Sequence, residues 1–192
     1  MSQGRRLPLL VVDGYNVVWG TERYRSLVEG EAHALPDVAH LSRDPYGHDP
    51  FERALEALAA DVAAYAKGTH EAVVVFDGAN NLNPERPDVR VGGVRCVFSA
   101  TGESADSAIE RMVSDARRQG RGVVLVTSDN TIRATVGGRP VATVSSSLLA
   151  SNMDEMDRDV EVARQERTHQ RLTLEDRLSP ADREKLRRLL GR

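Results

Sequence analysis

The chain has 192 residues, 40% hydrophobic and 29% charged, which is enough for a buried core held together without disulfides or structural metals. Its formal net charge of −3 gives no overall attraction to a polyanion, so contact with nucleic acid would need a local basic patch. Cys96 is the only cysteine, which excludes an intramolecular disulfide and fits a reducing, cytoplasmic setting.

The first predicted strand, residues 7–12, is a continuous apolar run that stops at Asp13. Such a run is typical of a parallel sheet that helices cover on both faces. It is too short for an export signal or a membrane span, so we expect no membrane partner. The next stretch, residues 20–48, is irregular and rich in Gly, Pro and His. We predict a surface insertion beside the site, with a short helix near residues 21–29.

Helices and strands alternate through the following hundred residues. Asp49, Pro50 and Glu52 form a helix start, and that helix is predicted to end at Ala66. Further predictions are strands at 72–76, 93–98, 123–126 and 141–144, a loop at 78–92, a helix at 105–119 capped by Ser104, and a short helix opened by Ser128-Asp129. The alternating pattern of the 93–98 strand predicts an edge position. The order of elements favours a mostly parallel α/β sheet.

The composition changes from Met153 onward, where forty residues hold ten acidic and ten basic side chains. Such mixed charge predicts an exposed helix followed by a linker, and its basic residues are best explained as a solvated face. Ser179 and Pro180 then predict the start of a final helix. We therefore expect a domain at residues 1–157, which includes the insertion, and a charged helical extension at residues 158–192.

Three of the predicted strands deliver an aspartate at their carboxyl end: Asp13, Asp77 and Asp129. Ligands of open α/β sheets bind in the crevice outside these strand ends. Glu103 and Asp106 lie three residues apart at a helix start, so they can face the same way and join the cluster. A lone aspartate beside Gly or Asn is often only a helix cap or turn residue, but three aligned strand ends favour a site.

So many carboxylates repel one another unless protons or a cation neutralise them. Hard oxygen ligands of this kind suit Mg²⁺ or Mn²⁺. One or two such ions can activate water and stabilise the leaving oxygen of a phosphodiester, so metal-dependent phosphodiester hydrolysis is the chemistry that fits best. The five histidines show no metal-ligand spacing, so a zinc site is not expected.

Four motifs in this order resemble the YacP-type branch of the NYN domains, within the PIN-like nuclease superfamily. They are Val12-Asp13-Gly14-Tyr15-Asn16, Val75-Phe76-Asp77, Glu103-Ser104-Ala105-Asp106 and Val126-Thr127-Ser128-Asp129, and the resemblance covers roughly residues 7–157. It implies a PIN-like three-layer α/β/α sandwich, a divalent-metal site and an endoribonuclease specific for single-stranded RNA. Members of the branch are associated with cleavage of mRNA on the ribosome.

The resemblance also implies roles for individual residues. Catalytic roles fall to Asp13, Asp77, Asp106 and Asp129, and metal binding falls to Asp13, Glu103, Asp106 and Asp129. Asn16 and Ser128 are expected to contact water or phosphate.

Basic and aromatic residues near the cluster are candidates for RNA contact. Arg86, Arg90 and Arg133 follow the strand ends, where a backbone phosphate could pass, although solvated surface explains each equally well. Tyr15 and Trp19 could stack on a base, but packing against the sheet edge is the favoured interpretation.

Two alternative functions stay open. One is a non-catalytic RNA- or ribosome-binding module of the same fold, and the other is a metal-dependent phosphatase or DNA nuclease. The insertion at 20–48 and the tail beyond residue 157 lie outside the resemblance, which leaves the choice of substrate open.

Overall fold

We describe the protein from a computed structural model, which covers residues 6–29, 50–78, 88–100, 102–136, 141–177 and 188. The chain divides into two compact units, Met1–Met153 and Asp154–Arg192. None of the helices in these described ranges is both long enough and apolar enough to cross a lipid bilayer.

The first unit is built on a six-stranded sheet with the order β3-β4-β2-β1-β5-β6. Its strands are β1 (Leu9–Asp13), β2 (Glu71–Phe76), β3 (Asp88–Val91), β4 (Val94–Phe98), β5 (Val123–Val126) and β6 (Val141–Val144). All neighbouring strands are parallel except β3 and β4. The predicted mostly parallel sheet is confirmed.

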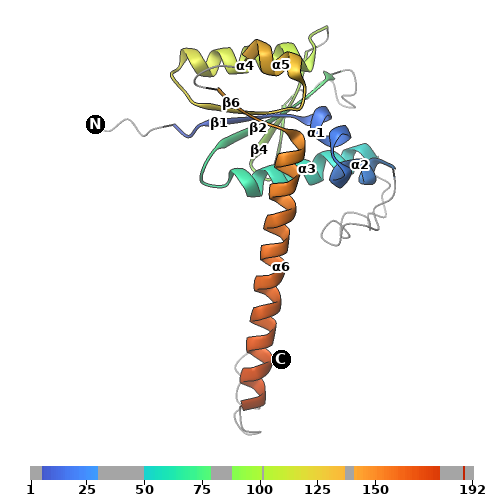
Figure 1. Cartoon of the computed structure of the whole chain (residues 1–192), viewed down its shortest axis with the longest axis vertical. Helices are drawn as coiled ribbons and strands as arrows, with labels where there is room; N and C mark the ends of the chain where they lie inside the picture. Colours follow the sequence, from blue (N-terminus) through green and yellow to red (C-terminus); the bar gives the residue numbers. More distant parts are fainter. Residues whose placement is uncertain are drawn as a thin grey trace, which may run out of the picture. The chain divides into compact units, whose positions relative to one another are not determined.

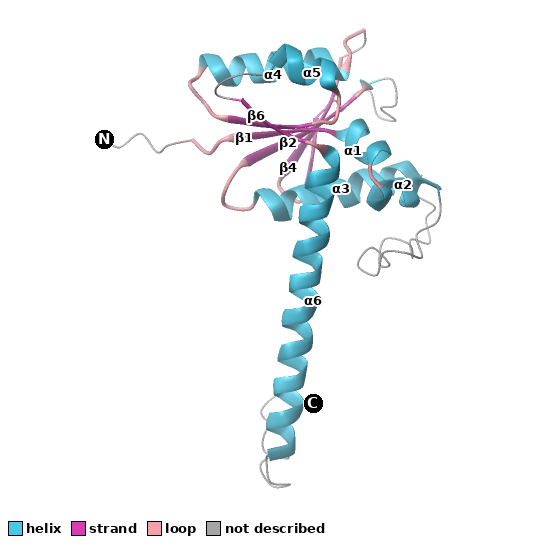
Figure 2. Cartoon of the chain, viewed as in Figure 1, coloured by secondary structure: helices cyan, strands magenta, loops and turns pink. Residues whose placement is uncertain are grey.

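Helices cover both faces of this sheet (Figures 1 and 2). They are α1 (Gly14–Gly20), α2 (Glu22–Glu29), α3 (Pro50–Ala66), α4 (Ala105–Arg118), α5 (Asn130–Val136) and the start of α6 (Ser146–Arg177), as far as Met153. One core cluster joins the sheet to α1, α2, α3 and the start of α6, and the other joins it to α4 and α5. The fold is therefore the predicted three-layer α/β/α sandwich.

The central strand β1 is buried along its whole length because both faces of the sheet are covered. Leu10 and Val12 face the α1–α3 layer, whereas Leu9 and Val11 face α4 and α5. Burying an aliphatic side chain of this size contributes roughly 1.5–3 kcal/mol, so this double-sided packing fixes the position of the strand end at Asp13.

The edge of the sheet differs from the prediction. Residues 88–91 were expected in a loop, but they form β3, which pairs antiparallel with β4. The edge strand is thus β3, and the prediction for β4 was wrong. Gly92 and Gly93 have φ angles of 58° and 91°, the positive values that a tight two-residue hairpin turn requires. This turn signal was hidden in a stretch rich in Asn, Pro and Gly.

Part of the predicted surface insertion belongs to the core. The short helix expected near residues 21–29 is α2, but Tyr24 on it is fully buried, so this segment is not a surface feature. The Tyr24 hydroxyl donates to Oδ2 of Asp61 on α3 at 2.8 Å. Residues 30–49, including the predicted cap Asp49, lie outside the described residues.

The C-terminal helix begins earlier than predicted. It starts at Ser146, seven residues before the expected change at Met153, and continues to Arg177. Leu149 and Met153 are buried in the core of the first unit, which explains the early start, since an apolar face directly follows β6. The final helix expected after Ser179 lies outside the described residues.

Candidate active site

The order of the strands reverses between β1 and β5. After β1, the chain forms β2, β3 and β4 on one side of β1, and then β5 and β6 on its other side. In open parallel sheets, ligands bind in the crevice that forms at such a switch point, outside the carboxyl ends of the strands. Asp13 is the last residue of β1, and Asp129 follows the end of β5.

Asp13 lies at the centre of this crevice and is only 7% exposed. Its Oδ1 accepts the backbone N–H of Asn16 at 3.2 Å, which caps α1, and its Oδ2 accepts the Thr127 hydroxyl at 3.0 Å. Burial raises the pKa of Asp13 above 3.8, the two hydrogen bonds oppose this rise, and the negative charges of Asp106 and Asp129 add to it. The site therefore holds a carboxylate that is costly to ionise.

Thr127 orients this carboxylate, and the sequence analysis assigned it no role. Its side chain is fully buried, and its hydroxyl both donates to Asp13 and accepts the N–H of Asp129 at 3.1 Å. A polar residue directly after an apolar strand, inside a recognised motif, was the signal that could have revealed it.

Asp129 is also a helix cap. Its Oδ1 accepts the N–H of Thr131 at 2.6 Å, at the start of α5. The simple interpretation of these aspartates as caps is therefore correct for both Asp13 and Asp129. It does not exclude a site, because capping fixes the carboxylates in place at the crevice.

Asp106 and Asp77 complete one electrostatic group with these two. Asp106 lies exposed in the first turn of α4, and desolvation raises its pKa, followed by the charges of Asp129, Glu110 and Asp77. We call Asp13, Asp77, Asp106 and Asp129 the aspartate cluster. These four come from four separate segments, and their charges are near enough to raise the pKa of Asp13 and Asp106 after burial has raised it.

Glu103 forms an ion pair with an arginine. The Arg111 guanidinium binds Glu103 Oε1 at 2.8 Å and Oε2 at 2.9 Å, and these hydrogen bonds lower the pKa of Glu103. Its charge is thus already balanced by a protein cation.

Asn16 and Ser128 take part in a network that joins three elements. Asn16 Oδ1 accepts the N–H of Ser128 at 2.8 Å and the Ser146 hydroxyl at 2.6 Å. Ser146, at the start of α6, also donates its N–H to the Ser128 hydroxyl at 3.1 Å. The network ties α1 and α6 to the end of β5, and Ser146 was missed because α6 was predicted to start later.

The predicted arginines are spread over different places. Arg133 lies on α5, one helical turn after Asp129, and its backbone N–H donates to the Asp129 carbonyl at 3.2 Å. Arg90 lies opposite Arg95, toward the amino end of β4, and the fold does not bring it to the cluster. Arg86 lies outside the described residues.

Gly14 explains why a glycine follows Asp13. A Cβ atom on Gly14 would lie 2.1 Å from Cε1 of Phe76, the last residue of β2. The absence of a side chain lets α1 begin directly against the Phe76 ring, so the Asp13 carboxylate can cap the helix and stay at the crevice.

A divalent ion fits the chemistry of the aspartate cluster. Among the described residues, no three His, Cys, Asp or Glu side chains are gathered closely enough to hold a metal by themselves. Mg²⁺, however, usually keeps several waters and binds one or two carboxylates together with substrate phosphates. Burial, and after it the charges of neighbouring aspartates, raise the pKa of Asp13 and Asp106, and a bound cation would favour the ionised form of both.

A surface hollow of about 740 Å³ opens at the opposite edge of the sheet, before β1 and β5, where Arg6 and Arg121 line it. Both arginines are engaged there, Arg6 with Gln119 and Arg121 with Glu71. This hollow contains no comparable group of reactive side chains, so we place the site at the carboxyl edge.

The YacP-like NYN domain family has a nuclease-type, RNA-related fold, and this α/β/α sandwich with its acidic edge has that fold. The chain matches the YacP-like NYN domain family over residues 10–190, and it belongs to that family. The resemblance drawn from the four motifs is confirmed. Its expected limit near residue 157 is wrong, because the match includes the C-terminal segment.

Two solved structures share the fold. The crystal structure of Rae1 (YacP) from Bacillus subtilis superimposes with a TM-score of 0.61 at 20% identity, covering 96% of this chain and 93% of that one. A point mutant of the same protein gives a TM-score of 0.62 at 20% identity, with 94% and 98% covered. No curated protein matches the chain.

Proposed function

We propose that the protein is a divalent-metal-dependent endoribonuclease that hydrolyses phosphodiester bonds in single-stranded RNA. The observation that carries the proposal is the buried Asp13 at the switch point, whose pKa is raised by its burial and by Asp106 and Asp129. A group of carboxylates that is costly to ionise without a counter-ion favours metal-assisted hydrolysis. Membership of the YacP-like NYN family supports RNA as the substrate class.

The residues at the carboxyl edge of the sheet would have separate roles in this reaction. One or two of the carboxylates of Asp13, Asp106 and Asp129 would bind Mg²⁺ or Mn²⁺ together with waters and the substrate phosphate, and the ion would lower the pKa of water and offset phosphate charge. Asn16 and Thr127 orient Asp13 through their hydrogen bonds. Arg133, beside Asp129, would contact a backbone phosphate.

The proposed setting is the cytoplasm, with mRNA engaged on the ribosome as the substrate. The resemblance to the YacP-type branch supports this setting.

Glu103 is the weakest of the predicted metal ligands, because Arg111 already balances its charge.

A cleavage assay tests the proposal. A labelled single-stranded RNA would be incubated with protein in Mn²⁺ or in EDTA, both alone and engaged on ribosomes. We expect cleavage in Mn²⁺ only, and a loss of at least about a hundredfold in Asp13→Asn and Asp106→Asn. Asp115→Asn is the matched control, since Asp115 lies in the last turn of α4 and pairs with Arg118.

The same assay distinguishes an endoribonuclease from a DNA nuclease or a phosphatase. Single-stranded DNA and p-nitrophenyl phosphate would be offered with the same metals. Faster turnover of either substrate than of RNA would replace the endoribonuclease by a DNA nuclease or a phosphatase.

A second candidate is a non-catalytic RNA-binding module. Two observations favour it. Among the described residues, no three acidic, His or Cys side chains form a group that could hold a metal, and Asp13 already accepts two hydrogen bonds. This module would bind RNA in EDTA with strong salt dependence and would keep that binding in Asp129→Asn. Metal-dependent cleavage would exclude it.

A further inference from the structure

Five aromatic rings form a continuous row along the carboxyl edge of the sheet. The rings in contact are Trp19 with Phe51, Phe51 with Tyr15, Tyr15 with Phe76, and Phe76 with Phe98, at centroid distances of 6.4, 5.2, 5.8 and 5.4 Å. Phe76 and Phe98 are the last residues of β2 and β4. The row therefore lies at the same edge that carries the aspartate cluster.

Trp19 ends this row and is exposed, unlike the other rings. It is 47% exposed, whereas Phe76 is 1% exposed and Tyr15 and Phe51 are partly buried. Its ring lies nearly parallel to Phe51, with an interplanar angle of 20°. Packing holds the indole in a fixed orientation and leaves much of it in water, an arrangement that suits a stacking partner from outside.

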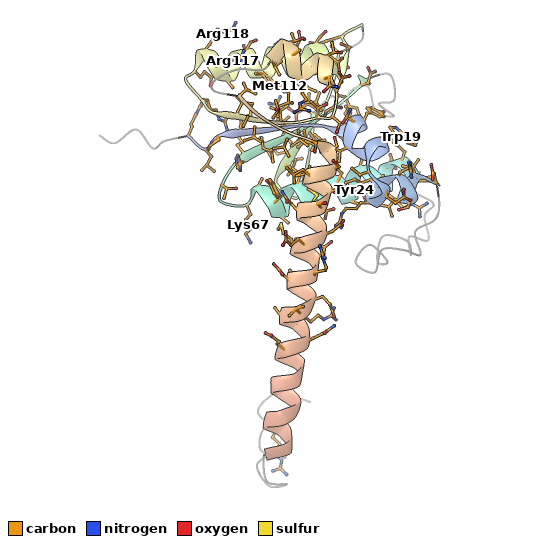
Figure 3. The ribbon with its side chains drawn as sticks, in the orientation of Figure 1. Trp19, Tyr24, Lys67, Met112, Arg117 and Arg118 are labelled. Atoms are coloured by element: carbon orange, nitrogen blue, oxygen red, sulfur yellow. The ribbon has the colours of Figure 1, made fainter. Side chains whose placement is uncertain are left out.

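The position of Trp19 relative to Asp13 is set by a short, rigid helix. Asp13 caps α1, and Trp19 lies near its other end, roughly 9 Å along the axis at 1.5 Å per residue. Asn16 in the same helix is bonded to Ser128 and Ser146, so the helix cannot move independently of the crevice. Figure 3 shows Trp19 by α1, away from Lys67 at the far end of α3.

We propose that Trp19 is a stacking platform for a nucleobase of single-stranded RNA, next to the phosphodiester that reaches the aspartate cluster. The inference rests on the proposed function and names the part of the substrate that this surface takes. Base stacking on an aromatic ring is tolerant of sequence, and it needs an unpaired base. The platform therefore selects single strands over duplexes.

Trp19 is the only tryptophan in the chain, so intrinsic fluorescence reports on this residue alone. The full-length protein in EDTA would be titrated with single-stranded oligoadenylate, with the same strand paired to oligouridylate, and with polyphosphate. Fluorescence anisotropy of labelled RNA would measure binding in parallel. We expect oligoadenylate to quench Trp19, while the duplex and polyphosphate leave its emission nearly unchanged.

Kinetics of variants give the second measurement. Trp19→Ala is expected to raise KM for single-stranded RNA about ten- to a hundredfold, with kcat changed less than about threefold, because the ring binds substrate and does not react. Trp19→Phe should recover most of the affinity, since a ring remains. Leu7→Ala is the control, because Leu7 is similarly exposed, at 44%, but lies before β1 at the opposite edge.

The outcomes separate the two proposals. RNA that binds and is cleaved without quenching Trp19, or a Trp19→Ala variant with unchanged KM, overturns the platform and leaves the nuclease intact. Quenching without cleavage keeps the platform and overturns the nuclease. Failure of the protein to bind or cleave RNA overturns the platform. A change of Trp19 emission with protein concentration alone also overturns it, because the ring is then covered by a second copy.

Discussion

The Thr127 hydroxyl donates a hydrogen bond to Oδ2 of Asp13 at 3.0 Å, although the two residues are 114 positions apart in the chain. The bond is buried and joins the carboxyl ends of β5 and β1. The same hydroxyl accepts the N–H of Asp129, so a single side chain positions both central carboxylates.

Replacing Thr127 by Val keeps its shape but removes this hydroxyl. We expect the free energy of unfolding to fall by about 1–2 kcal/mol, because a buried carboxylate and a backbone N–H each lose a partner. Urea denaturation measures the effect. Thr127→Ser keeps the hydroxyl and should lose less, and equal stability of the Val variant and the wild type would show that the bond contributes nothing.

Asp13→Asn should abolish cleavage, and its effect on stability in EDTA should depend on pH. The folded pKa of Asp13 is raised above its model-peptide value of 3.8, so the folded state takes up a proton more readily than the unfolded chain. The ionised side chain therefore costs stability above the folded pKa, and that cost disappears as the pH falls through it.

Thermal melts of wild type and Asp13→Asn between pH 4 and pH 8 check this. Asparagine has one acceptor oxygen, so the variant loses one of the two hydrogen bonds of Asp13 at every pH. The Tm of the variant relative to that of the wild type should be highest at pH 7 and should fall toward pH 4, where the wild-type carboxylate takes up its proton. A difference in Tm that stays constant between pH 7 and pH 4 would contradict the raised pKa.

Gly14→Ala tests the close approach of α1 to β2. The added Cβ would meet the Phe76 ring at 2.1 Å, and overpacking of this kind costs about 1–3 kcal/mol. Gly20→Ala is a control in the same helix, because the nearest atom there, Cβ of Ser146, is 3.9 Å away. Adding Phe76→Leu should recover part of the loss at Gly14, and two equally tolerated alanines would refute the steric explanation.

Glu103→Gln separates the ion-paired carboxylate from the aspartate cluster. Arg111 pairs with Glu103 at an exposed position, so the change should cost less than about 1 kcal/mol of stability. Cleavage should fall less than about tenfold, against at least about a hundredfold for Asp106→Asn. A loss as large as that of Asp106→Asn would restore Glu103 as a metal ligand.

The sheet and the aspartates of the site can be predicted from the sequence, but the side chains that hold these aspartates in place cannot. Apolar runs that end in Asp13, Asp77 and Asp129 predict three adjacent parallel strands, since periodicity and turn residues are local signals. Other contacts at this site are not local. Thr127 binds Asp13 and Ser146 binds Asn16 through hydrogen bonds that span more than a hundred residues, and only the closed fold brings them together.

Short elements were missed for a different reason. The helix α1 has seven residues, too few to show a helical period, and it starts at a glycine. The strand β3 has four residues and follows a stretch that favours turns. In both cases tertiary contacts decide the structure, namely Gly14 against Phe76 and the pairing of β3 with β4.

The most direct test of the central claim is cleavage of one single-stranded RNA by wild type and Asp13→Asn, with Mn²⁺ and with EDTA. The account predicts products only for the wild type in Mn²⁺, while Asp13→Asn stays folded in EDTA. If the wild type leaves RNA intact in Mn²⁺, free and on the ribosome, or if Asp13→Asn cleaves it equally well, the aspartate cluster is not a nuclease site.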